Sequence, residues 1–190
     1  ENSGDSRLIL NFVLNTPIAN PGSDQTISCG NNSVQLGTSI DVFDDFETGT
    51  GNWTFTSPWA RSTGISTITN RSGSSYFALM TGGSGNNGYY LTFNGTLPAG
   101  TSRKISFYFI NPGNSSAGFD EAFLDYYNGS SWTTLADIDN GAGSGASTDG
   151  WIYKEYTIPD NATNLRFRPN MYSNTYDGIG IDNITITTPL

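Results

Sequence analysis

Apolar and polar residues alternate along much of the chain. Between positions 105 and 109, Ile and Phe alternate with Ser and Tyr, and between 165 and 168, Leu and Phe alternate with Arg. A period of two places successive side chains on opposite faces of a β-strand. Apolar residues hardly ever recur at helical spacing. The pattern therefore predicts strands with one buried face.

Similar short segments occur throughout the sequence, separated by Gly, Asn, Pro and Ser. Such a series of short strands and turns predicts an all-β fold, an antiparallel sandwich or barrel. The further predicted strands are 8–14, 25–29, 33–36, 52–56, 65–69, 76–80, 89–93, 122–127, 132–136, 152–158 and 179–187.

Two local features of these strands can be predicted. Asn128-Gly129 lies between two strand-like segments, and this dipeptide tolerates the positive φ of a tight hairpin turn. In the last predicted strand the parity of the isoleucines changes between Ile181 and Ile184. A β-bulge at Asp182-Asn183 would explain that change.

A domain boundary is predicted near residue 40, with an N-terminal arm at 1–40 and a sandwich at 41–190. Within the arm, residues 17–36 resemble the opening strands of bacterial immunoglobulin-like surface repeats. Segment 8–14 is apolar and must pair with a sheet, either in its own chain or, as a donor strand, in a neighbouring copy. Its proposed assembly residues are Leu8, Leu10, Phe12 and Leu14.

Composition narrows the classes of function. The chain has 8 Lys+Arg against 17 Asp+Glu, a net charge of −9, and 13% aromatic residues. The aromatics argue against disorder, and the small number of cations argues against nucleic-acid binding. No apolar run reaches the length of roughly 18 residues that a membrane span requires. The sequence begins at Glu1 without a methionine, which we interpret as a processed or excised terminus.

The residues that are missing exclude much catalytic chemistry. There is no His, and Cys29 is the single cysteine. His-based triads, His-ligated zinc and internal disulfides are therefore excluded. Glycoside hydrolysis needs two facing carboxylates, whereas Phe123 stands between Glu121 and Asp125 where a third period-two carboxylate would be. We expect no enzymatic activity.

Short motifs in a fixed order run through residues 41–187. They include Asp44-Asp45-Phe46-Glu47, then Trp53, then Gly73-Ser74-Ser75, and finally Ile181-Asp182-Asn183-Ile184. This order resembles the jelly-roll modules of secreted proteins, namely MAM-like domains, cleaved-adhesin domains and related carbohydrate-binding modules. The resemblance implies a jelly-roll β-sandwich and an extracellular, cell-surface location.

The same resemblance implies a structural calcium ion held by Glu47 and Asp182, with Asp45 and Ser75 as weaker candidate ligands. Calcium prefers oxygen ligands, and two carboxylates with backbone carbonyls would join the first and last strands. The alternative is that residues 44–47 form a solvated acidic turn.

Aromatic residues and sequons offer candidate surface features. Aromatic rings can stack on sugars, although the same residues fit ordinary sandwich packing. The weak carbohydrate-binding candidates are Trp59, Tyr89, Tyr90, Tyr126 and Tyr127. The candidate glycosylation sites are Asn31, Asn52, Asn70, Asn94, Asn114, Asn128, Asn161 and Asn183.

Two functions fit these observations. The first is a non-enzymatic extracellular structural or adhesive protein that assembles into filaments by adding strand 8–14 to the next copy. The second is a carbohydrate-binding module of a larger secreted enzyme or adhesin. The expected partner is the chain itself in the first case and a surface glycan in the second.

Overall fold

The computed structural model describes residues 38–81, 88–111, 121–138, 150–170 and 178–189. The sandwich belongs to one compact unit, Ser39–Leu190. The predicted strands at 8–14, 25–29 and 33–36 lie outside the described residues.

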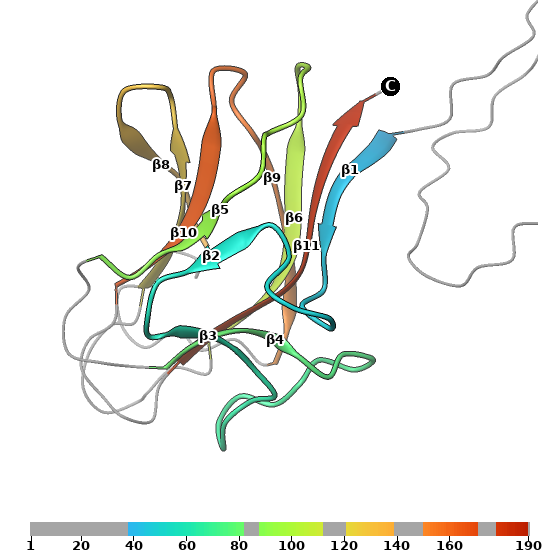
Figure 1. Ribbon diagram of the computed structural model, residues 1–190, viewed down its shortest axis with the longest axis vertical. Coiled ribbons are helices and arrows are strands. Elements are labelled where there is room, and N and C mark those ends of the chain that lie inside the picture. The colour runs from blue at the N-terminus through green and yellow to red at the C-terminus, as the bar shows by residue number, and fades with distance from the viewer. Residues whose placement is uncertain (1–37, 82–87, 112–120, 139–149, 171–177, 190) are drawn as a thin grey trace, which may run out of the picture. The chain divides into compact units, whose positions relative to one another are not determined.

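Two antiparallel sheets pack face to face, as the alternating pattern predicted (Figure 1). In the six-stranded sheet the order is β3-β4-β11-β6-β9, and β1 also pairs with β11. Its strands are β1 (Thr38–Asp44), β3 (Trp59–Ser62), β4 (Phe77–Thr81), β6 (Lys104–Ile110), β9 (Ile152–Thr157) and β11 (Gly178–Pro189).

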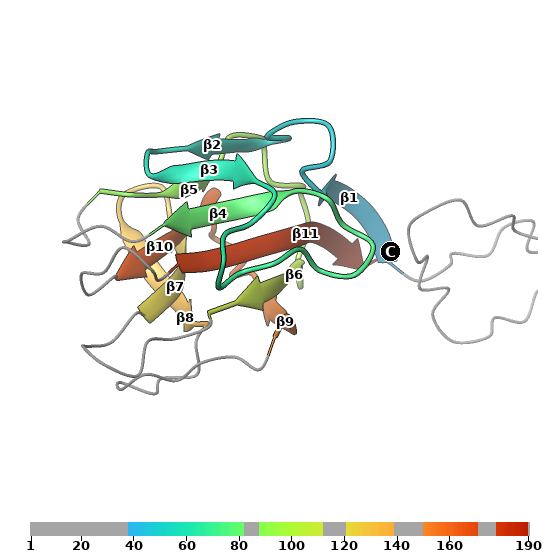
Figure 2. The same cartoon turned by 90° about the horizontal axis from the view of Figure 1, so that it is seen from below.

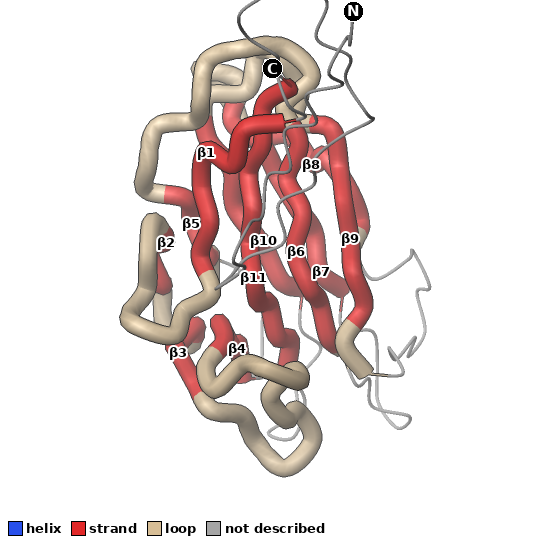
Figure 3. Tube along the Cα trace, turned by 90° about the vertical axis from the view of Figure 1, so that its right-hand side faces the viewer, coloured by secondary structure: helices blue, strands red, loops and turns tan. Residues whose placement is uncertain are grey.

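The five-stranded sheet has the order β2-β5-β10-β7-β8. Its strands are β2 (Trp53–Phe55), β5 (Leu91–Phe93), β7 (Glu121–Tyr127), β8 (Trp132–Asp137) and β10 (Asn164–Asn170). Figure 3 shows the two layers of strands joined by loops, with no helix among the described residues.

The core lies between the sheets and follows the period of two. On β6, Ile105, Phe107 and Phe109 are each 0% exposed, and on β10 Leu165 and Phe167 are buried in the same cluster. The intervening arginines of β10 lie on the opposite face, at intermediate exposure. Burial of apolar area is the main stabilising contribution to such a sandwich. The predicted strands at both positions are confirmed.

The long strand β11 joins the beginning of the sandwich to its end. β4 pairs with the first residues of β11, Gly178 to Ile181, while the Ser39 hydroxyl of β1 donates to the Thr188 carbonyl near its end. Figure 2 shows β4 and β1 lying along successive parts of β11. The first and last strands of the sandwich are therefore neighbours.

A second apolar cluster lies on the other face of the six-stranded sheet. Phe77 and Leu79 point away from the main core and pack with Ile68, and Trp151 adds an edge-to-face contact with Phe77 at 5.0 Å. Ile68 belongs to the loop between β3 and β4. This loop therefore covers part of the sheet's outer face.

The predicted hairpin and bulge are both present. Asn128 accepts from the backbone N–H groups of Ser130 and Ser131, and Gly129 has φ of 95°. The turn thus uses the Asn128 side chain rather than a positive φ at that residue. In β11 the register shifts between Asp182 and Thr185, and Asn183 has φ of 49°.

One predicted strand is absent, and two observed strands were not predicted. Segment 65–69 forms no strand, only an isolated bridge between Gly64 and Thr69. Strands β1 and β3 were not predicted. β1 begins at Thr38. Its alternation is obscured because Asp41 and Asp44 interrupt a short apolar run.

Candidate functional site

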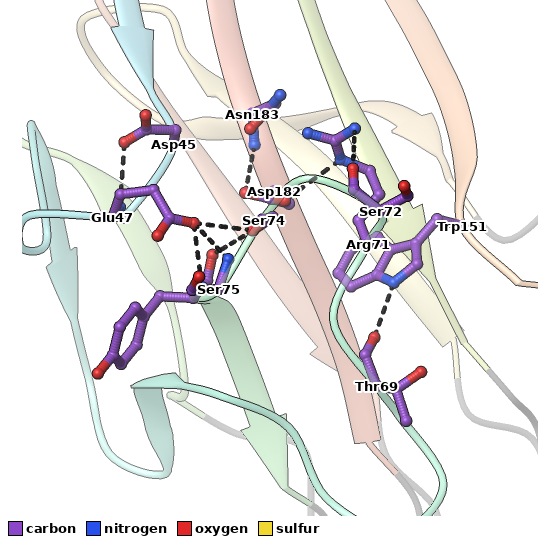
Figure 4. Close-up of polar contacts among 11 residues, drawn as sticks. Asp45, Glu47, Thr69, Arg71, Ser72, Ser74, Ser75, Trp151, Asp182 and Asn183 are labelled. Atoms are coloured by element: carbon purple, nitrogen blue, oxygen red, sulfur yellow. Dashed lines mark hydrogen bonds and ion pairs between the residues drawn. The ribbon is translucent and has the colours of Figure 1, made fainter.

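Glu47 and Asp182 lie in one polar cluster although 135 positions separate them in the sequence (Figure 4). Glu47 follows β1, and Asp182 is the bulge residue of β11. Between them lies Ser74, from the loop before β4. The Ser74 hydroxyl donates to Glu47 Oε1 at 3.0 Å, and the Ser75 and Tyr76 N–H groups donate to the same oxygen at 2.7 and 3.1 Å.

The bulge turns the Asp182 side chain into the protein, where it is 0% exposed. Its Oδ1 accepts from the Asn183 N–H at 2.8 Å, and its Oδ2 pairs with Arg71 Nε at 3.3 Å. The Arg71 guanidinium also lies 4.4 Å from the centre of the Tyr108 ring. Arg71 therefore connects the β3–β4 loop to β11 and β6.

The two carboxylates have opposite pKa shifts. Burial raises the pKa of Asp182 above its usual value, although the Ser74 hydroxyl, the Asn183 amide and Arg71 oppose this effect. Partial desolvation raises the pKa of Glu47 too, but the amides of Ser75 and Tyr76 outweigh it, so this pKa is lowered. Glu47 is therefore the more firmly ionised of the pair.

A second arginine binds the backbone beside Glu47. Arg61, on β3, donates from Nε to the Phe46 carbonyl and from Nη2 to the Glu47 carbonyl at 2.5 Å. Its guanidinium carbon lies 3.3 Å from the centre of the Tyr76 ring. We call Glu47, Ser74, Asp182, Arg61 and Arg71 the Glu47–Asp182 cluster.

The other two predicted calcium ligands have different roles. Asp45 Oδ1 accepts from the Glu47 N–H at 3.0 Å, and Ser75 contributes its backbone N–H to Glu47. Among the described residues, no group of three or more Asp, Glu, His or Cys side chains is placed so that it could hold a metal ion. The structural calcium ion stays a prediction.

A different array covers the outer face of the five-stranded sheet. Asp125 of β7 is 2% exposed and accepts hydrogen bonds from three neighbours. They are Arg166 Nε at 3.0 Å, Arg168 Nε at 2.9 Å and the Thr134 hydroxyl at 3.1 Å. Burial alone would raise the pKa of Asp125, but the two guanidinium groups lower it below its usual value.

Aromatic rings surround these arginines. The Arg166 guanidinium lies 3.9 Å from the Tyr90 ring centre and 4.2 Å from that of Trp132, so it is enclosed between two rings. Trp132 also contacts Tyr127, with ring centres 5.3 Å apart. We call Tyr90, Tyr127, Trp132, Arg166, Arg168 and Asp125 the aromatic face.

The structure separates the five predicted carbohydrate-binding residues. Tyr90 and Tyr127 belong to the aromatic face, whereas Tyr89 and Tyr126 pack against the core. Trp59 is 4% exposed in the core, which corrects the prediction of a surface ring at this position.

Trp132, Arg166 and Arg168 were not predicted as site residues. The available signal was the alternation on β10, which places both arginines opposite the buried Leu165 and Phe167. Trp132 is half-buried on β8, directly opposite Tyr127.

The predicted glycosylation sites differ in exposure. Asn52, Asn70, Asn94 and Asn161 are exposed, while Asn128 and Asn183 are half-buried. Asn31 and Asn114 lie outside the described residues. The Asn183 amide can donate to Asp182 Oδ1 at 3.3 Å and accept from Arg71 Nη2 at 2.6 Å.

No protein-family model matches the sequence, and a search of the curated proteins gives no match. Solved structures do match. The K3 cleaved adhesin domain of Lys-gingipain from Porphyromonas gingivalis has a TM-score of 0.55 and 15% identity, covering 80% of this chain and 99% of that chain.

Two carbohydrate-binding modules are also similar to the chain. The CBM22-1 xylan-binding domain from Paenibacillus barcinonensis Xyn10C has a TM-score of 0.53 and 13% identity, over 80% of this chain and 96% of that chain. The C-terminal family 22 carbohydrate binding module of Clostridium thermocellum Xyn10B has a TM-score of 0.50 and 18% identity, over 78% and 92%.

These matches confirm the jelly-roll sandwich and its resemblance to cleaved-adhesin domains and carbohydrate-binding modules. At such low identity, they establish the fold alone. The described part of the chain contains no helix with the length and hydrophobicity that crossing a membrane would require.

Proposed function

We propose that this chain is a non-enzymatic, extracellular adhesive module that binds carbohydrate on the aromatic face. One observation carries the proposal: Trp132, Tyr90 and Tyr127 gather on one sheet face around charged groups that are already fixed by hydrogen bonds. The similarity in fold to an adhesin domain and to xylan-binding modules supports it.

The chemistry of the face suits a sugar. Pyranose rings present C–H groups that pack on aromatic rings, and their hydroxyls bind guanidinium and carboxylate groups. Asp125 holds Arg166 and Arg168 in place before any ligand arrives. Groups that are fixed in advance lose less conformational entropy on binding.

The same contacts argue against catalysis by Asp125. A glycosidase acid or nucleophile must be free to exchange a proton or to attack the sugar. Asp125 is buried, its two oxygens are bound to two arginines, and its lowered pKa keeps it ionised, so it is neither a proton donor nor free to attack a sugar. Its role in this proposal is to position the arginines.

The test is binding to soluble polysaccharides, with xylan as the first probe. Affinity electrophoresis and calorimetry measure the binding. Trp132→Ala removes the largest ring of the aromatic face and should weaken binding about tenfold or more. Tyr153→Ala is the matched control, because Tyr153 is a 56% exposed aromatic residue on β9 of the other sheet. This variant should bind as the wild type does.

Two results would contradict the proposal. One is that neither xylan nor a broad glycan array binds the wild-type chain. The other is that Trp132→Ala and Tyr153→Ala lose affinity equally. Thermal unfolding of both variants checks that any difference comes from the lost contact and not from unfolding.

A specific observation favours assembly as a second function. β1 pairs with β11 and exposes two large apolar side chains, Ile40 at 44% and Phe43 at 36%. An exposed strand of this kind can accept an added strand, with main-chain hydrogen bonds giving affinity and side-chain contacts giving register. The apolar segment 8–14 of another copy has the composition to serve as that strand.

Deleting residues 1–16 tests the assembly proposal by light scattering and electron microscopy. The full chain should form polymers, and the deletion variant should be monomeric. Ile40→Lys, which alters the receiving strand and leaves the donor intact, should also reduce polymer length. Polymers that persist in the deletion variant would rule out strand addition by this segment.

The extracellular location is part of the proposal. The sequons at Asn52, Asn70, Asn94 and Asn161 are exposed and would be accessible to a glycosylating host.

A further inference from the structure

We infer that two arginines, Arg61 and Arg71, replace a metal ion as the positive charges that hold the segment after β1 and the bulge of β11 to β3 and the β3–β4 loop. The Glu47–Asp182 cluster lies where the sequence resemblance implies calcium, and the donors present there do not fit that ion. The sandwich is therefore closed by the chain's own side chains. This inference does not depend on carbohydrate binding.

The charges of the cluster are already matched. Glu47 and Asp182 are its two carboxylates, and Arg61 and Arg71 are two guanidinium groups in contact with the same segments. Calcium would bring two further positive charges close to both arginines, which is unfavourable in a partly buried site.

Two further carboxylates, Asp44 and Asp45, lie beside the cluster, and each is engaged by donors of its own segment. Asp45 accepts from the Glu47 N–H. Asp44 is 6% exposed and accepts from the Asn52 N–H at 3.1 Å and from Trp53 Nε1 at 3.0 Å. Both carboxylates therefore have partners of their own.

Most oxygen atoms that could bind calcium in the cluster already accept hydrogen bonds. Calcium requires about six to eight oxygen ligands. Here the carbonyls of Phe46 and Glu47 accept from Arg61, and both oxygens of Asp182 accept from Arg71 and the Asn183 amide. Glu47 Oε1 accepts three hydrogen bonds. Ligating an ion would require breaking several of these contacts.

Aromatic rings hold each arginine in place. Arg61 lies on the Tyr76 ring at 3.3 Å, and Arg71 lies on the Tyr108 ring at 4.4 Å. A cation above a ring is attracted by the ring's quadrupole, and the planar guanidinium is well suited to this geometry. The rings thus orient Arg61 toward the segment that follows β1 and Arg71 toward β11.

Thermal unfolding in EDTA and in millimolar calcium provides the test. The wild-type Tm should be the same in both solutions. Arg71→Met keeps the length of the side chain but leaves the Asp182 carboxylate without its cation, so its Tm should fall by roughly 5–10 °C. Lys104→Met is the matched control, because Lys104 forms an exposed ion pair with Glu155 on the same sheet and its loss should leave Tm unchanged.

A second measurement tests directly whether Arg71 or calcium neutralises Asp182. Once Arg71 is removed, calcium should raise the Tm of Arg71→Met, because the ion can then approach Asp182. A calcium-dependent rise in the wild-type Tm that Glu47→Gln abolishes would overturn the inference. A calcium-dependent rise in Tm that persists in Glu47→Gln would come from calcium binding elsewhere in the chain and would agree with the inference. An Arg71→Met variant as stable as the wild type would also overturn it.

Discussion

At the scale of the residue, a buried carboxylate fixes the turn that follows β1. Asp44 accepts from the Asn52 N–H and the Trp53 indole, and burial raises its pKa above the usual value despite these bonds. Gly51 lies against this carboxylate with φ of 58°, in the left-handed region. A Cβ atom at Gly51 would overlap the Asp44 carboxylate. Glycine is therefore required both by conformation and by space.

Gly51→Ala should lower the free energy of unfolding by about 2 kcal/mol, because it strains the backbone and displaces a buried carboxylate. Urea denaturation provides the measurement. Gly49→Ala is the control, since a Cβ there meets nothing within 4 Å, and it should change stability by less than about 0.5 kcal/mol. Equal effects of the two substitutions would show that Gly51 has no special role.

At the scale of the element, Asp125 joins three strands of the five-stranded sheet. It lies on β7, its arginine partners lie on β10, and Thr134 lies on β8. Each arginine also contacts an aromatic ring, so one carboxylate orders a large part of the outer face. These cross-strand contacts explain how polar side chains stay fixed on the outer face of the sheet, where no apolar core packs against their charged groups.

Asp125→Asn should cost about 3 kcal/mol at neutral pH, because two partly buried arginines lose their counter-ion. The pKa of Asp125 is lower in the folded than in the unfolded protein, since the arginines outweigh the effect of burial. The stabilisation is therefore complete above the unfolded pKa of about 4 and is lost as pH falls through the lower folded pKa.

Urea unfolding of both proteins between neutral and acidic pH measures this effect. The difference between wild type and Asp125→Asn should be constant above about pH 5 and should shrink below about pH 4. A difference that stays constant into acid, or that grows there, would contradict the assigned role of Asp125.

At the scale of the whole molecule, the sequence predicted the sandwich because its signals are local. Ile105, Phe107 and Phe109 alternate within a single strand, and the parity change around Asp182 is visible between Ile181 and Ile184 of another. The core of β6 and the bulge of β11 follow directly from these patterns.

The aromatic face and the two arginines of the Glu47–Asp182 cluster could not be predicted in this way. Trp132 and Tyr90 share a face only because β8 and β5 belong to one sheet. Neither segment's sequence predicts the order of strands in that sheet. The burial of Trp59 could not be predicted from the sequence either. The alternation of a four-residue strand indicates two faces but does not tell which of them meets the core.

The adjacency of β1 and β11 has a mechanical consequence. The two strands run in opposite directions, so the start of β1 lies beside the end of β11 (Figure 1). Tension applied between the start of β1 and the end of β11 would break the hydrogen bonds between the two strands one after another from that end. It would not load all of them at once in shear. The Glu47–Asp182 cluster lies at the opposite end of this strand pair, so its contacts would be the last to break.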